Sequence, residues 1–140
     1  MKNTIWVVVA DEAIARILEW QPTKNKLSPV EALSDATAHA KEADLHHDAA
    51  GRRNGSVTAS AADTARHIEG QRFAKRVADK LKEGAQSGRF DSLRIVAAPR
   101  FLGQLRLAIE GSPLAKLVAG TLDKDLVHAT DQELAVKLFS

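Results

Sequence analysis

The residues with the clearest capacity for chemistry are basic, and they gather in the middle of the chain. Arg52 and Arg53 belong to a Gly-Arg-Arg-Asn-Gly segment, and a helical pattern rich in lysine and arginine follows it. Their charged groups can hold phosphate oxygens without reading base sequence. Tyrosine is absent, and the few Phe and Trp residues fit core positions, so base stacking has no support. The pattern predicts one positive surface for structured RNA or the ribosome, built from Arg52, Arg53, Lys75, Arg76, Lys80 and Arg100.

Imidazole and amide groups form a second candidate site around the same segment. His46 and His47 precede the two arginines, and His67 and Gln71 lie in the helical pattern after them. Neutral imidazoles ligate zinc or act as acid and base. No pair has the i, i+4 spacing of a helical metal motif, so we expect solvated loop histidines, no metal site, and at most a polar loop–helix site.

The acidic residues allow one further enzymatic interpretation. Asp11, Asp91, Asp123 and Asp125 could gather at strand ends and hold two magnesium ions, as in nucleases. The simpler interpretation gives each of them a role in a turn. The glycine spacing fits no nucleotide-binding loop, and no Gly-x-Ser-x-Gly elbow is present, so no cofactor is expected. Whether the chain is an enzyme stays open.

The composition bounds the fold that must position these groups. The chain has 140 residues, 44% of them hydrophobic and 27% charged, with a formal charge of +2 and no cysteine. This composition is typical of one globular domain without disulfides. The apolar run from Ile5 to Ala10 is too short to span a membrane and lacks the features of a signal peptide. We therefore expect a cytoplasmic protein with no membrane partner.

Hydrophobic patterning predicts three strands, a long loop, and then alternating helices and strands. Gly84, with lysines before it, reads as the end of the first helix. Thr130 and Glu133 form a capping box for the last helix. The expected fold is one α/β domain over residues 1–140, with a mixed sheet flanked by helices. The expected elements are strands at 5–10, 13–20 and 27–33, a loop at about 34–62, a helix from Asp63 or Thr64 to Gly84, a strand at 91–98, a helix at 101–110, a strand at 116–122, and a C-terminal helix.

Gly103 lies in the first turn of the helix expected after the strand at 91–98. It either permits close helix–sheet packing or lets a partner's backbone approach closely. Arg100, just before it, could help this helix N-terminus hold an anion.

Two stretches and a hairpin together resemble the bacterial host attachment protein family. The hairpin runs from Ala10 to Ile17, the first stretch is Phe73 to Leu81 followed by Phe90-Asp91-Ser92-Leu93, and the second is Ala97 to Arg106 followed by Leu122 to Leu126. The specific parts are Pro99-x-Phe101-Leu102-Gly103-x-Leu105-Arg106 and Asp123-Lys124-Asp125-Leu126. That family is in turn similar to the central domain of archaeal and eukaryotic peptide-chain release factors. The resemblance implies a ribonuclease-H-like fold and a role at the ribosome. The Gly-Gly-Gln motif of those factors is absent, and Gly70-Gln71 falls inside the expected helix.

Three functions follow as expectations. The leading one is a non-enzymatic adaptor that binds the translation apparatus or structured RNA. The second is a hydrolase acting on peptidyl-tRNA or RNA esters. The third, implied by the family, is a protein-interaction module in bacterial attachment to host cells.

Overall fold

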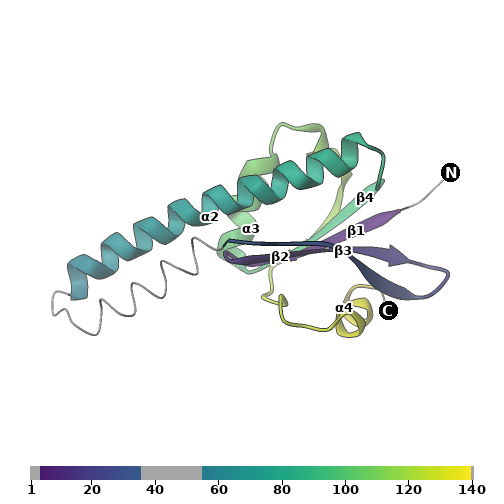
Figure 1. Cartoon of the computed structure of the whole chain (residues 1–140), viewed down its shortest axis with the longest axis horizontal. Helices are drawn as coiled ribbons and strands as arrows, with labels where there is room; N and C mark the ends of the chain where they lie inside the picture. The colour runs from purple at the N-terminus through teal and green to yellow at the C-terminus, as the bar shows by residue number, and fades with distance from the viewer. Residues whose placement is uncertain (1–3, 36–54, 140) are drawn as a thin grey trace.

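The computed structural model describes residues 4–35 and 55–139, with side chains described from Thr64 onward in the first helix. Its elements follow the expected order (Figure 1). They are β1 (Ile5–Ala10), β2 (Ile14–Gln21), β3 (Lys26–Ser34), α2 (Gly55–Gln86), β4 (Ser92–Ala97), α3 (Pro99–Ile109), the 3-10 helix η1 (Pro113–Leu117), β5 (Val118–Leu122) and α4 (Asp131–Phe139).

One five-stranded mixed sheet has the strand order β3-β2-β1-β4-β5. The first three strands form an antiparallel meander, and β4 and β5 run parallel to β1. The helical connections between β3, β4 and β5 explain the parallel part, because parallel strands need a crossover. This order and these directions confirm the expected α/β class and agree with the ribonuclease-H-like fold.

β1 is the central strand, and its side chains face both layers of the core. Trp6 and Val8 pack with α2 and α3, whereas Val7 and Val9 pack on the side of α4. Residues 6–10 are therefore all buried, as the apolar run predicts. α2 and α3 cover one face of the sheet and α4 covers the other (Figure 1).

The first helix differs from the expectation at both ends. α2 begins at Gly55, so the last part of the segment expected as loop is helical, and residues 36–54 lie outside the described residues. The helix also continues past Gly84 to Gln86. At Gly84 an added Cβ would lie 2.9 Å from Cη2 and Cζ3 of Trp6. Glycine is therefore present here to fit a tryptophan ring and does not end the helix.

The C-terminal helix begins with the predicted capping box. The Thr130 N–H donates to Glu133 Oε1 at 3.0 Å, and the Glu133 N–H donates to Thr130 Oγ1 at 3.1 Å. Arg16 of β2 holds the segment before this helix. Its guanidinium donates to the carbonyls of Val127 and Ala129 and to Asp131 Oδ1. α4 is thereby fixed against the meander.

Candidate functional site

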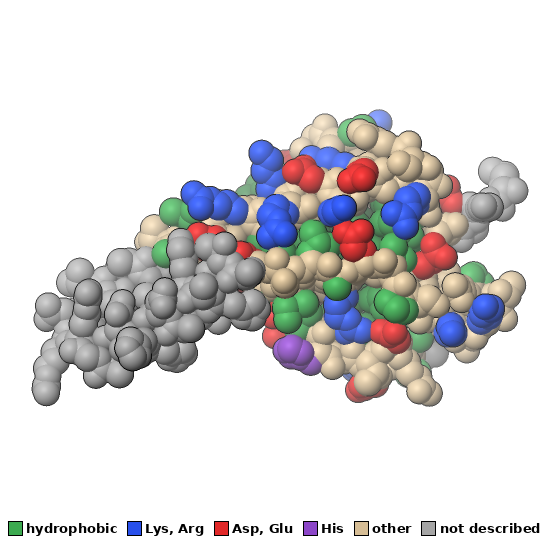
Figure 2. Space-filling view, viewed as in Figure 1, with side chains coloured by type: hydrophobic (Ala, Val, Ile, Leu, Met, Phe, Trp, Pro, Cys, Tyr) green, Lys and Arg blue, Asp and Glu red, His purple; other side chains and the backbone are tan. Residues whose placement is uncertain are grey.

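Basic side chains line the outer face of α2. Between Thr64 and Gln86 the helix carries six Lys or Arg and three Asp or Glu residues. Arg72, Arg76 and Lys80 follow one another at every fourth position, so they form one row along the helix, with steps of about 6 Å. Figure 2 shows lysine and arginine side chains along this face, with acidic side chains between them. We call these three residues the basic row.

Each member of the basic row has a partner within the chain. Arg72 Nη1 lies 3.6 Å from Glu69 Oε1, Arg76 Nη1 donates to the Ser34 carbonyl at 3.3 Å, and Lys80 Nζ lies 3.3 Å from Glu31 Oε2. The side chains of Arg72 and Lys80 are nonetheless 71% and 44% exposed. The Lys80–Glu31 pair is exposed on both sides and contributes about 0–1 kcal/mol, whereas the Glu69 side chain that pairs with Arg72 is only 9% exposed. Lys80 can therefore exchange its partner for an external anion at small cost.

The other predicted basic residues lie outside this row. Lys75 is exposed three residues after Arg72 and so lies beside the row on α2. Arg100 is the second residue of α3, and its Nε lies 3.8 Å from Oε1 of Glu12, which follows the end of β1. Arg52 and Arg53 lie outside the described residues. The structure thus brings together Arg76 and Lys80, adds Arg72, and separates Arg100 from them by pairing it with Glu12.

The predicted polar site has a structural role where the structure describes it. Gln104 of α3 is buried, and its Nε2 donates to the carbonyl of His67 at 3.1 Å and to His67 Nδ1 at 3.2 Å. A Cβ on Gly70 would lie 2.6 Å from Gln104 Oε1. His67 and Gly70 therefore serve the contact between α2 and α3. Gln71 is exposed, and His46 and His47 lie outside the described residues.

The carboxylates weighed as a nuclease site do not all lie at one end of the sheet. Asp11 Oδ1 accepts the N–H groups of Ala13 and Ile14, both at 2.8 Å, in the turn between β1 and β2. Asp91 Oδ2 accepts the Thr4 N–H at the opposite end of the sheet, before β4 begins. In the described part of the chain, no group of three or more His, Asp or Glu side chains is arranged to hold a metal ion. The turn interpretation of Asp11 is confirmed.

Residues 6–138 match the model of a family described as proteins required for attachment to host cells. The chain belongs to this family. No curated protein matches the sequence. Among solved structures, the chain is similar to the Aquifex aeolicus Ppx/GppA phosphatase, type II variant, at 14% identity and a TM-score of 0.41. The match covers 86% of this chain and 36% of the phosphatase.

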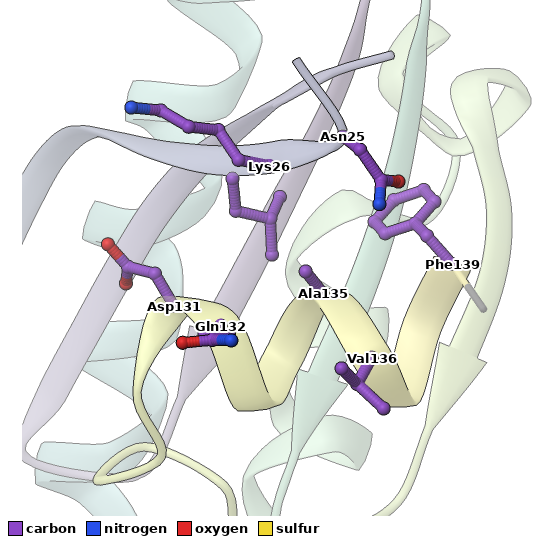
Figure 3. A pocket seen from close by; sticks show the side chains of 8 residues that line it. Asn25, Lys26, Asp131, Gln132, Ala135, Val136 and Phe139 are labelled. Carbon is purple, nitrogen blue, oxygen red and sulfur yellow. The ribbon is translucent and has the colours of Figure 1, made fainter. Parts of the chain in front are cut away.

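Two grooves in this family member have no counterpart in the sequence interpretation. The first, about 520 Å³, lies between α4 and the β2–β3 hairpin (Figure 3). Its walls include Leu27, Ala135 and Phe139, with the polar groups of Asn25 and Gln132 beside them. The second, also about 520 Å³, lies between α3 and β5. Both grooves depend on how segments distant in sequence pack together, which local sequence patterns do not predict.

Among the described residues, no helix is long and apolar enough to cross a membrane.

Proposed function

We propose that this host attachment family protein is a non-enzymatic adaptor that binds structured RNA, such as that of the ribosome, along the basic row of α2. The observation that supports this proposal is the alignment of Arg72, Arg76 and Lys80 on one exposed helix face. Guanidinium groups favour phosphate because they can donate two parallel hydrogen bonds to it. The expected similarity to release-factor domains, which is itself part of this proposal, favours RNA over other polyanions.

The rest of the chain supports contact with the RNA backbone alone. Four of the six Trp and Phe rings, Trp6, Phe73, Phe90 and Phe101, are each at most 3% exposed. The other two, Trp20 and Phe139, are partly buried and stack on each other with 4.0 Å between ring centroids. Binding that rests on phosphate contacts is independent of base sequence and falls steeply with salt. Three such contacts give a slope of log K against log salt of about −2 for single strands and about −2.7 for B-form duplex DNA.

The binding experiment compares two variants that lose equal charge. Arg72→Gln/Arg76→Gln/Lys80→Gln removes the basic row, and Lys24→Gln/Lys116→Gln/Lys124→Gln removes three exposed cations elsewhere. Fluorescence anisotropy with a labelled RNA hairpin between 50 and 200 mM KCl measures both. We expect the first variant to bind on the order of 10- to 100-fold more weakly at 50 mM and to lose most of the salt slope. The control variant should stay close to the unmodified protein.

Three results would argue against the proposal. The first is no binding of the unmodified protein at 50 mM KCl. The second is an equal loss in both variants, which would mean that net charge alone drives the association. The third is tighter binding of heparin than of RNA under the same conditions, which would indicate that the basic row binds an acidic polysaccharide.

A further inference from the structure

Two members of the basic row are held by a strand of the sheet. Lys80 Nζ lies 3.3 Å from Oε2 of Glu31, and Arg76 Nη1 donates to the Ser34 carbonyl at 3.3 Å. Glu31 and Ser34 both belong to β3, which is an edge strand. The oxygen atoms of this strand therefore use the same donor groups that a phosphate would need.

A β-bulge turns Glu31 towards α2. On one side of the bulge, Pro29 pairs with Leu18, whose side chain is in the core on the α4 side of the sheet. On the other side, Glu31 pairs with Ile17, whose side chain is in the core on the α2 side. Because side chains along a strand alternate between its faces, Pro29 and Glu31 would share the α4 face if the register did not shift. Bulges commonly re-aim a side chain in this way, and here a carboxylate is brought to the basic row.

The pair of Glu31 and Lys80 is open to solvent. The two side chains are 36% and 44% exposed, so an external anion can reach the Lys80 ammonium. A carboxylate that the fold holds beside this ammonium acts at a high effective concentration. Any ligand that uses Lys80 must first displace it. An exposed pair of this strength weakens the binding of such a ligand by up to about 5-fold.

We infer that Glu31 is an autoinhibitory residue of the basic row, and that its carboxylate occupies Lys80 until a phosphate of bound RNA displaces it. This inference rests on the proposed RNA-binding function and adds a form of regulation to it. Ser34 contributes a main-chain carbonyl, which a side-chain substitution does not remove. Glu31 is therefore the residue of β3 through which the inhibition can be tested.

The test is a double-mutant cycle of Glu31→Gln and Lys80→Gln, measured by fluorescence anisotropy with a labelled RNA hairpin at 50 mM KCl. We expect Glu31→Gln alone to bind RNA about 3- to 5-fold more tightly than the unmodified protein, because Lys80 is then free for phosphate. In the Lys80→Gln background the same substitution should have little effect. Urea unfolding should give Glu31→Gln nearly the midpoint of the unmodified protein, because the pair is exposed.

Asp79→Asn is the matched control. It removes one exposed carboxylate of α2 next to Lys80 in the sequence, and side chains at adjacent helix positions do not face each other. We expect this variant to bind RNA as the unmodified protein does.

Unchanged or weaker binding of RNA to Glu31→Gln, while the unmodified protein binds, would overturn the inference and leave the proposed function intact. Equal gains from Glu31→Gln and Asp79→Asn would overturn it as well, because net charge would then explain the effect. A full gain from Glu31→Gln in the Lys80→Gln background would have the same meaning. No binding of RNA to any of these proteins would overturn the proposed function, and this inference with it.

Discussion

Gly84→Ala tests whether the absence of a side chain at this position of α2 leaves the space that the Trp6 ring occupies. A Cβ at this position would lie 2.9 Å from two ring carbons of Trp6 and 3.2 Å from Cε1 of Phe90. The Trp6 ring cannot easily move aside. It is 2% exposed, stacks on Phe90 with 4.6 Å between ring centroids, and its Nε1 donates to Glu19.

Two opposing effects decide the magnitude. Alanine in place of glycine improves helix propensity by about 1 kcal/mol. Overpacking of a well-filled core costs about 1–3 kcal/mol. Because the Trp6 ring is held by its neighbours, we expect a cost in the upper part of this range. We expect Gly84→Ala to lower the free energy of unfolding by about 2 kcal/mol, equivalent to about 6 °C in Tm for a domain of this size.

Gly103→Ala is the matched control, because it makes the same change on an exposed helix face with open space around it. It should raise stability by about 0.5–1 kcal/mol. Urea unfolding followed by tryptophan fluorescence gives both values, with the midpoint compared at constant slope. If Gly84→Ala shifted the midpoint upward as Gly103→Ala does, the close packing of Trp6 on α2 would be refuted.

Three further predictions concern the attachment of α4. Arg16→Ala should cost about 3 kcal/mol in urea unfolding and speed amide exchange in α4, because two carbonyls and Asp131 lose a charged donor; an unchanged exchange rate would contradict this. Phe139→Ala should cost about 1–2 kcal/mol and shift the emission of Trp20, whose ring stacks on Phe139 at 4.0 Å. The pKa of Glu133 is lowered from 4.5, first by its hydrogen bond to the backbone of Thr130 and then by the Thr130 hydroxyl and Lys137. Because the pKa is lowered in the folded state, the ionised Glu133 carboxylate stabilises the fold above its ordinary pKa, and this stabilisation is lost as the pH falls. The stability of Glu133→Gln should therefore fall less than that of the unmodified protein below pH 4.5. Carboxyl NMR titration measures the pKa.

Local chemistry made most of the elements predictable from sequence. The β-branched run of β1 and the Thr130–Glu133 capping box act through near neighbours in the chain, and both are confirmed. The mixture of strand directions was also predictable, because a short hairpin joins antiparallel strands and parallel strands need a crossover. The pairing of β4 with β1 was not predicted from the sequence.

The glycines were misread because their roles depend on residues far away in sequence. Gly84 accommodates Trp6, which no pattern within α2 reveals. Gly103, weighed as a packing glycine, has no atom near its Cβ position, so the packing interpretation is wrong. The positions of Arg76 and Lys80 on one helix face followed from periodicity, whereas the pairing of Arg100 with Glu12 required the tertiary fold. The two grooves likewise arise only once α3 and α4 are packed.

The central place of β1 has a consequence for synthesis of the chain. The meander of β1, β2 and β3 is complete once residue 34 has been made, but the second edge of β1 pairs with Ser92–Ala97. At synthesis rates of about 5–20 residues per second, this gap corresponds to about 3–13 seconds. During that interval the Val7–Val9 segment offers an apolar, unpaired edge to other nascent chains. Slow translation between the two halves would thus favour aggregation, and a chaperone that shields this edge would favour correct folding.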